Sequence, residues 1–233
     1  MEEPKLIDTK HEFSYEKLDG NITNCLTAII EKLKKGQMSV MIGAGFSKNA
    51  NPAYPNWEEL LVPAYCELHS ICESTLNKDK RKKIEQEISK NPSKIAQEYI
   101  DMKGRREDLD IYIDKTLSRI DNSRVTNLTT HRSLLKINWN DIITTNWDTL
   151  LEKEFSNEYI IIKKAKELKY QNKKRIIKIN GSLRTSGEQE KRIYNFDDCF
   201  DYLYVITEDD FNTYHSKHSD FSNFMKVKIL QVI

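Results

Sequence analysis

The residues best suited to chemistry in this sequence follow the apolar stretch Ser39–Ile42, after which Gly43-Ala44-Gly45 comes at once. A short, apolar, partly β-branched run is typical of a buried parallel strand. In open α/β sheets, glycines after a strand let backbone N–H groups approach a diphosphate that a Cβ would block, and the turn can also require φ > 0. Lys48 stands where the third glycine of G-x-G-x-x-G would be, so a nucleotide site and a turn without ligand both stay open.

Polar side chains also follow two further apolar runs. Thr145-Asn146-Trp147-Asp148 comes directly after Asp141–Thr144, and Asn180-Gly181-Ser182 comes directly after Arg175–Ile179. Residues at the carboxyl ends of parallel strands point into the crevice where α/β sheets bind ligands. The sequence therefore predicts that the three strand ends meet around one ligand.

The surrounding elements alternate strands and helices, which predicts an α/β fold with a Rossmann-like, doubly wound parallel sheet. Asn21–Lys35 has apolar residues at helical spacing and precedes Gly36, so we expect an amphipathic helix with a glycine stop. Asn56 and Glu59 have the spacing of a capping box. The other expected elements are helices at 129–136 and from 149, strands at 159–162 and 202–206, a helix capped by Thr207 with Asp210 as its third residue, and a helix from 221.

Residues 73–120 are highly charged and helical in pattern, so we expect a helical insertion over one edge of the sheet. It would serve as a subdomain, a lid or an oligomer surface. Ser93 is expected to cap one of its helices, and the basic run at 78–83 is expected to be a solvated face rather than a nucleic-acid patch. Trp57, just before the insertion, either lines a pocket or belongs to the core.

The composition excludes several classes of protein. Among 233 residues, 37 Lys+Arg balance 36 Asp+Glu, and a net charge of +1 gives no overall attraction to nucleic acid or to a membrane surface. No apolar run approaches ~18 residues, and the first residues lack the apolar part of a secretory signal. The cysteines form no C-x-x-C pair, which argues against a zinc ribbon and suits reduced thiols in a cytoplasmic protein. They are Cys25, Cys66, Cys72 and Cys199.

The three strand ends, in this order and spacing, resemble the SIR2-like family, the NAD-consuming relatives of sirtuins, and its bacterial defence branch in particular. They read Gly43-Ala-Gly-Phe-Ser47, Thr144-Thr-Asn-Trp-Asp148 and Lys178-Ile-Asn-Gly-Ser182. Pro52–Leu61 and Tyr204–Phe211 also look like this family. The resemblance implies a SIR2-like NAD-binding domain over residues 37–233, preceded by a lead-in and a helix at 1–36.

The resemblance also implies a role for each strand end. Asn146 would contact the nicotinamide ribose and position the attacking water, and Asp148 would hold the nicotinamide carboxamide. Hydrolysis of the nicotinamide–ribose bond needs such a layout, because positive charge develops on the ribose and the site must fix both the sugar and a water. The residues expected to bind NAD+ are Gly43, Ala44, Gly45, Phe46, Ser47, Thr145, Asp148 and Gly181.

One residue departs from the family pattern at the fourth strand end. The family has Lys-apolar-His-Gly there, and the histidine is its general base, whereas this chain has Asn180. An amide can hydrogen-bond a ribose hydroxyl, but it cannot take up a proton near pH 7. We therefore expect Asn146 and Asn180 as the catalytic pair of a chain that binds NAD+ better than it cleaves it. A natural low-activity member and a variant disabled to trap NAD both stay open as the origin of Asn180.

Two further departures concern zinc and length. The chain lacks the four zinc cysteines of sirtuin deacetylases, which argues against removal of acyl groups from lysine and for simple NAD hydrolysis without metal. The family continues beyond the point where Ile233 ends this chain, so a truncation of a longer polypeptide is expected. His215 and His218 match no family motif and are expected at the surface.

The resemblance therefore implies an NAD+ hydrolase that depletes NAD+ in antiphage defence. It further implies a homo-oligomer and a fused or separate sensor protein, with the helical insertion gating or assembling the site. The alternative that Asn180 favours is a module of a defence complex that binds NAD or ADP-ribose and regulates a partner without chemistry. A deacylase or ADP-ribosyltransferase that acts on protein, and an assembly domain with a vestigial pocket, stay open as well.

Overall fold

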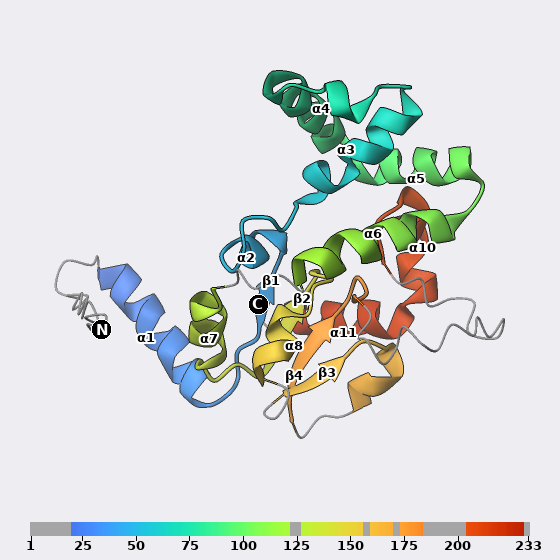
Figure 1. Ribbon diagram of the computed structural model, residues 1–233. Coiled ribbons are helices and arrows are strands. Elements are labelled where there is room, and N and C mark those ends of the chain that lie inside the picture. Colours follow the sequence, from blue (N-terminus) through green and yellow to red (C-terminus); the bar gives the residue numbers. More distant parts are fainter. Residues whose placement is uncertain (1–19, 122–126, 156–158, 170–172, 184–203, 231–233) are drawn as a thin grey trace, which may run out of the picture.

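A parallel four-stranded sheet lies at the centre of the computed structural model, which describes residues 20–121, 127–155, 159–169, 173–183 and 204–230 (Figure 1). Ile142, in the second strand, pairs with Val40 on one side and with Ile176 on the other. Because every pairing is parallel, the carboxyl ends of β1, β2 and β4 lie next to one another. The strand order is β1 (Val40–Ile42), β2 (Asp141–Thr144), β4 (Lys174–Lys178) and β3 (Tyr159–Ile162).

Helices cover both faces of this sheet. Successive side chains of a strand point to opposite faces, so Ile142 and Ile143 belong to different apolar clusters. The Ile142 cluster includes residues of α7 and α8, and the Ile143 cluster includes residues of α10 and α11. The predicted α/β fold, with a parallel sheet between helices, is therefore confirmed. These helices are α7 (Thr129–Leu135), α8 (Leu150–Phe155), α10 (Glu208–Lys217) and α11 (Ser219–Leu230).

Strand β1 is at the right place in the sequence, but the prediction that it is buried is wrong for most of its length. Among the described residues it pairs with β2 alone, so one of its sides has no neighbouring strand. Only Ile42 is buried, and the side chain of Met41 is 56% exposed. The apolar sequence thus identified a strand but could not tell a central strand from an edge strand.

Helix α1 (Gly20–Lys34) forms where the apolar spacing predicts it, yet none of its residues is buried. Ile22, Ile29 and Ile30 are all exposed, and Figure 1 shows the helix at one end of the molecule, away from the sheet. Its C-terminus has the predicted glycine stop. Gly36 has φ +61, and the next residue donates its N–H to the Lys32 carbonyl at 2.9 Å, which closes a Schellman motif.

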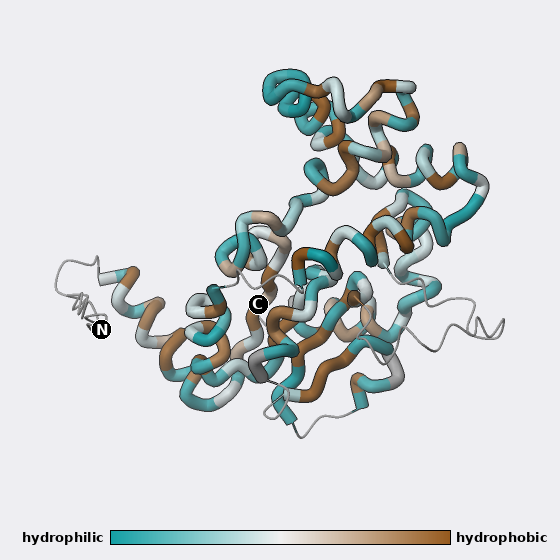
Figure 2. Tube along the Cα trace, viewed as in Figure 1, coloured by the Kyte–Doolittle hydropathy of each residue, from teal (hydrophilic) through white to brown (hydrophobic). Residues whose placement is uncertain are grey.

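Residues 57–121 are mainly helical and contain the range 73–120, for which the sequence predicts a helical insertion. Figure 1 shows α3, α4 and α5 at one end of the molecule, with α6 running from them back towards the strand ends. In Figure 2 the strands are mostly hydrophobic, whereas α4 is largely hydrophilic. The four helices are α3 (Trp57–Leu68), α4 (Lys78–Lys90), α5 (Pro92–Lys103) and α6 (Arg106–Asp121).

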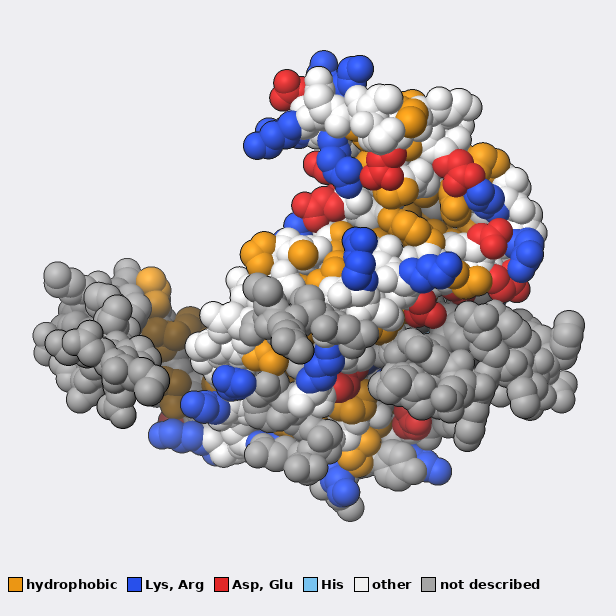
Figure 3. Space-filling view, in the orientation of Figure 1, with side chains coloured by type: hydrophobic (Ala, Val, Ile, Leu, Met, Phe, Trp, Pro, Cys, Tyr) orange, Lys and Arg blue, Asp and Glu red, His pale blue; other side chains and the backbone are white. Residues whose placement is uncertain are grey.

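The insertion presents mixed charge rather than a basic patch. Five of the six residues at 78–83 are exposed, as predicted for a solvated face, and Arg81 lies between Glu73 and Glu85 at 3.2 and 3.4 Å. Figure 3 shows acidic and basic side chains interspersed over this part of the surface. The prediction that Ser93 caps a helix is wrong. Asn91 caps α5 instead, because Pro92 occupies the first helical position.

The remaining local predictions divide between confirmed caps and an unconfirmed strand. Asn56 with Glu59, and Thr207 with Asp210, both form complete capping boxes. The strand expected at 202–206 is reduced, within the described residues, to a single bridge between Gly181 and Tyr204. The lead-in at 1–19, residues 202–203 and Cys199 lie outside the described residues. In the part of the chain that is described, no helix is long and apolar enough to cross a bilayer.

Candidate active site

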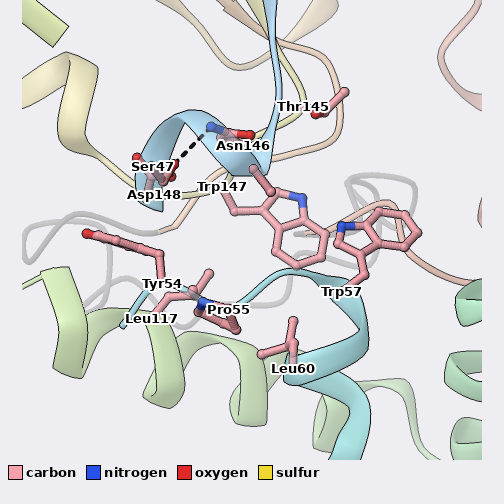
Figure 4. A pocket seen from close by; sticks show the side chains of 11 residues that line it. Ser47, Tyr54, Pro55, Trp57, Leu60, Leu117, Thr145, Asn146, Trp147 and Asp148 are labelled. Atoms are coloured by element: carbon pink, nitrogen blue, oxygen red, sulfur yellow. Dashed lines mark hydrogen bonds between the residues drawn. The ribbon is translucent and has the colours of Figure 1, made fainter. Parts of the chain in front are cut away.

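Three polar side chains from two strand ends are joined by hydrogen bonds. The Asn146 amide donates through Nδ2 to the Ser47 hydroxyl at 2.9 Å, and that hydroxyl donates to Asp148 Oδ2 at 2.6 Å (Figure 4). Asn146 Nδ2 also donates to the Gly43 carbonyl at 3.0 Å. Ser47 belongs to the short helix α2 (Ala44–Lys48) that follows β1, so these bonds hold the glycine loop against the end of β2.

The segment 146–148 is fixed by its own backbone and by a buried lysine. The Asn146 N–H donates to the Thr144 hydroxyl at 2.9 Å, and Asp148 Oδ1 accepts the Leu150 N–H at 3.1 Å at the start of α8. Lys178, at the end of β4, is 1% exposed. Its ammonium group donates to the carbonyls of Trp147 and Asp148. Lys178 thus ties the end of β4 to the segment that carries the candidate catalytic residues.

A pocket of about 420 Å³, counting its part open to solvent, lies beside this polar group. One part of its wall is polar and the other is aromatic and apolar, which suits a ligand with a sugar and a flat ring. The lining residues are Ala44, Ser47, Tyr54, Pro55, Trp57, Leu60, Leu117, Thr145, Asn146, Trp147 and Asp148.

Asn146 carries an unsatisfied acceptor in this pocket wall. Its Oδ1 atom is buried and has no hydrogen-bond partner, although Nδ2 of the same amide donates twice. Leaving a buried polar atom without a partner costs roughly 1–3 kcal/mol. A ribose hydroxyl or a water bound at the site would supply the missing donor, so the residues present fit a nucleotide sugar.

The glycines of the loop are not required by the backbone. Gly43 has φ −126, and Gly45 is not among the positive-φ glycines of the described residues, so the expectation that this turn requires φ > 0 is wrong. A Cβ on Gly43 would lie 3.7 Å from the Thr145 hydroxyl, an ordinary contact, and one on Gly45 would meet nothing within 4 Å. The space beside Gly45 is therefore open for the approach of a ligand. Such an approach is the first of the two roles expected for these glycines from the sequence.

The structure brings together half of the residues expected from the sequence. Ala44, Ser47, Thr145, Asn146 and Asp148 all line the pocket. The expected residues that are not among the lining residues are Gly43, Gly45, Phe46, Asn180 and Gly181.

Each of these other residues has a different neighbour or constraint. Phe46 lies against His131, with ring centroids 4.5 Å apart. Gly181 has φ +95, a conformation that favours glycine. Asn180 adjoins the pocket wall through its carbonyl, which accepts the indole N–H of Trp147 at 2.8 Å. The backbone of residue 180 is therefore hydrogen-bonded to Trp147, which lines the pocket.

Several lining residues carried no signal in the sequence. Leu117 comes from α6 of the insertion, and its apolar type is equally typical of a core residue. Tyr54 lies in the loop before α3 and is 2% exposed. Trp57 was an open choice between pocket and core, and it does line the pocket. Only the tertiary contact between the insertion and the strand ends could have placed Leu117 and Tyr54 here.

Asp121, the last residue of α6, joins the insertion to the pocket. The hydroxyls of Tyr54 and Thr149 both donate to its carboxylate, and Lys153 forms an ion pair with it at 3.3 Å. Burial, followed by the neighbouring Asp121, raises the pKa of Tyr54, so this hydroxyl stays protonated and remains a donor. One carboxylate at the end of α6 thus holds Tyr54, which lines the pocket, and Thr149, which follows the lining residue Asp148 in the chain.

A second buried cluster fixes the residues behind the aromatic wall. Arg106 of α6 donates to both carboxylate oxygens of Asp210 at 3.0 and 2.9 Å and to Asp110 at 3.1 Å. It also donates to the carbonyl of Tyr204, whose ring centroid lies 5.0 Å from that of Trp147. The cluster therefore connects α6 and the start of α10 to the pocket.

Asp110 in this cluster gives a prediction about pH. Burial raises its pKa from 3.8 to about 6, although Arg106 acts in the opposite direction. Because the folded-state pKa exceeds the unfolded one, Asp110 contributes stability at low pH that is lost as pH rises from about 4 to about 6. The free energy of unfolding of Asp110→Asn minus that of the unchanged chain is therefore expected to increase by roughly 2–3 kcal/mol from pH 4 to pH 7. Urea unfolding at each pH measures this difference.

Asp101→Asn is the matched control, because Asp101 is exposed on α5 and accepts a hydrogen bond from the Gln97 amide at 3.0 Å. Its unfolding free energy is expected to follow that of the unchanged chain across the same pH range. A constant difference between Asp110→Asn and the unchanged chain would show that Asp110 is ionised equally in both states.

Part of the sequence matches a known protein family. Residues 140–231 match the family model described as SIR2-like domain, and this range includes Asn146, Asp148 and Asn180. Over this range the sequence is therefore similar to a SIR2-like domain. The chain is also 24% identical over 217 residues to "Defense-associated sirtuin 2" of Bacillus subtilis. The alignment covers 91% of this chain but only 19% of that relative, so the chain spans about a fifth of the relative's length.

Within the described ranges there is no candidate metal centre, since no three His, Cys, Asp or Glu side chains converge there. The expectation of a site without zinc stays a prediction. His215 is exposed and shares a hydrogen bond of 3.0 Å with Ser222, and neither it nor His218 is among the residues that line the pocket.

Proposed function

We propose that this chain binds NAD+ in the pocket at the strand ends and belongs to a protein that hydrolyses NAD+ in antiphage defence. The unsatisfied Oδ1 of Asn146, beside Asp148 and an open glycine loop, is the observation that carries the proposal. The defence role is supported by the name of the relative. That relative is about five times as long as the stretch that matches this chain.

The chemistry proposed is displacement of nicotinamide by water, which yields nicotinamide, ADP-ribose and one proton. Nicotinamide leaves as a neutral group, so the site must mainly fix the ribose and the water while positive charge develops on the sugar. Asn146 Oδ1 would accept a hydrogen bond from a ribose hydroxyl or from the water. Asp148, fixed by Ser47 and by the Leu150 N–H, would accept from the carboxamide NH2.

Replacing Asn146 by alanine tests this proposal. The substitution removes the acceptor expected to bind the ribose, and we expect the dissociation constant for NAD+ to rise by about tenfold, the usual effect of one hydrogen bond. Isothermal titration calorimetry of the chain with NAD+ measures the change, and thermal unfolding checks that the variant is folded.

Asn138→Ala is the matched control, because the Asn138 amide donates to the Leu33 carbonyl far from the pocket and is exposed. Its NAD+ affinity is expected to equal that of the unchanged chain. Unaltered NAD+ affinity in Asn146→Ala, or no binding by the unchanged chain, would show that the pocket is not a site for NAD+.

A second candidate is a regulatory module that binds NAD+ or ADP-ribose without cleaving it, and Asn180 is the observation in its favour. Saturable binding of both ligands, with no nicotinamide released even when His occupies position 180, would support this function. The homo-oligomer and the sensor protein implied by the resemblance stay predictions, as does the gating role of the insertion.

A further inference from the structure

Asp121 is a buried carboxylate that the proposed chemistry does not use. It ends α6, its exposed fraction is 7%, and it is not among the residues that line the pocket. A buried carboxylate is costly unless it is hydrogen-bonded or paired. Its Oδ1 atom accepts from the Tyr54 hydroxyl, and its Oδ2 atom accepts from the Thr149 hydroxyl and lies 3.3 Å from the Lys153 ammonium. Three segments of the chain therefore meet at this one side chain.

Two of the three partners belong to the segment that carries Asp148. Thr149 directly follows Asp148, and Lys153 lies one turn further along, in α8, where its N–H donates to the Thr149 carbonyl at 3.0 Å. The Lys153 ammonium also donates to the backbone carbonyl of Asp121. The end of α6 is therefore attached to the start of α8 through both a side chain and the backbone.

The anchor at Thr149 determines how the Asp148 carboxylate is held. Asp148 Oδ2 accepts from the Ser47 hydroxyl at 2.6 Å, and Oδ1 accepts from the Leu150 N–H at 3.1 Å. Thr149 is the residue between Asp148 and Leu150, so its position affects both ends of the second bond. A carboxylate has about four acceptor positions, and these two bonds leave room for an N–H of a ligand.

Tyr54, the third partner, lines the pocket close to the same carboxylate. Burial raises the pKa of Tyr54 most, Asp121 raises it next, and the charge of Asp148 adds to both. Figure 4 shows the Tyr54 hydroxyl and Asp148 at the same end of the pocket. Because this hydroxyl donates its proton to Asp121, it does not occupy an acceptor position of Asp148. Asp121 thus keeps a neighbouring donor away from that carboxylate.

We propose that Asp121 is a positioning residue of the NAD+ site, which holds Thr149 so that the Asp148 carboxylate faces the nicotinamide carboxamide. The inference rests on the proposed function and adds a residue of α6 that acts without touching the ligand. Because Asp121 acts through Asp148, it should matter for a ligand that carries the carboxamide. It should not matter for ADP-ribose, which lacks the nicotinamide.

The test compares NAD+ with ADP-ribose by calorimetric titration of the full chain and of Asp121→Ala. In Asp121→Ala the dissociation constant for NAD+ should rise by about 3- to 10-fold, the usual effect of one hydrogen bond, and that for ADP-ribose should not change. Asp121→Asn should recover most of the NAD+ affinity. Its amide can still accept from the Tyr54 hydroxyl and can donate to the oxygen of Thr149.

Thr149→Val tests the same link without altering the carboxylate. It removes the hydroxyl and leaves Asp121 bonded to Tyr54 and Lys153. We expect the same selective loss of NAD+ affinity, and the double variant with Asp121→Ala should lose little more than either single variant, because both break one contact. This variant also decides the question if Asp121→Ala does not fold.

Two exposed residues away from the pocket provide matched controls. Asp101 lies on α5, and the Thr27 hydroxyl donates to the Thr23 carbonyl within α1 at 2.9 Å. Asp101→Ala and Thr27→Val should leave the affinities for both ligands unchanged. Thermal unfolding of every variant shows which of them are folded.

The outcomes separate this inference from the function on which it rests. If the unchanged chain binds NAD+ and both Asp121→Ala and Thr149→Val keep that affinity, Asp121 does not position the site and the NAD+ site stands. If NAD+ and ADP-ribose lose affinity equally, Asp121 acts through the fold as a whole and the inference is overturned. If the unchanged chain binds neither ligand, both proposals are wrong.

Discussion

Replacing Asn180 by histidine is expected to raise the rate of nicotinamide release from NAD+ by about 10²–10⁴-fold, the usual contribution of a general base. The attacking water must lose a proton, and an amide cannot accept one near pH 7, whereas imidazole can. The carbonyl of residue 180 is bonded to Trp147 in the pocket wall, so a histidine there would begin beside the site. Chromatographic measurement of nicotinamide released from NAD+ gives the two rates.

Asn138→His is the control, since it adds a histidine at an exposed position away from the pocket. It should leave the rate of nicotinamide release unchanged. The gain in Asn180→His should also depend on pH, increasing as the new imidazole loses its proton, with a midpoint near the ordinary histidine pKa of about 6.5. A rate for Asn180→His equal to that of the unchanged chain at every pH would favour the regulatory module over the hydrolase.

Replacing Lys178 by methionine is expected to lower the free energy of unfolding by about 3–5 kcal/mol, the usual cost of removing one partner of a buried ion pair. Lys178 is 1% exposed, and its ammonium lies 2.7 Å from Glu152. Without it, the Glu152 carboxylate loses its counter-charge and the carbonyls of Trp147 and Asp148 lose a donor. Urea unfolding measures the loss, and Lys173→Met, at an exposed position before β4, is the control.

A double variant separates the ion pair from the carbonyl contacts. Lys178→Met combined with Glu152→Leu removes the unpaired carboxylate, so it should recover a large part of the lost stability. It should not recover NAD+ affinity, because the segment that carries Asn146 would still lack the bonds to its carbonyls. Equal stability of Lys178→Met and the unchanged chain would mean that the ammonium contributes nothing net to the fold.

Local patterns in the sequence predicted much of the sheet and many helix ends. Strands β2 and β3 begin and end where apolar runs meet polar residues, and the capping boxes at Asn56 and Thr207 depend on spacings of three residues. These features are set by interactions within a few residues of each other. Asn146 and Asp148 could be placed in the pocket for the same reason, because they directly follow a strand.

The predictions that were wrong or incomplete concern how the helices and strands pack against one another. The amphipathic helix α1 forms as predicted but has no buried residue, and β1 proved to be an edge strand among the described residues. Ser93 is a residue type common at helix N-caps, but α5 begins at Pro92, so Asn91 is its N-cap. Leu117 reaches the pocket only because α6 returns to the strand ends. Such contacts join residues far apart in the chain, and periodicity carries no information about them.

The carboxylate of Asp121 has a consequence for communication across the molecule. It ends a helix of 16 residues and at the same time accepts from Tyr54, which lines the pocket, and from Thr149, which directly follows the lining residue Asp148. A displacement of that helix would therefore shift Tyr54 and the segment that carries Asp148 together. By thermodynamic linkage, a protein that binds α3, α4 or α5 and so displaces α6 would change the affinity for a nucleotide at the strand ends. The nucleotide would change the affinity for that protein by the same factor.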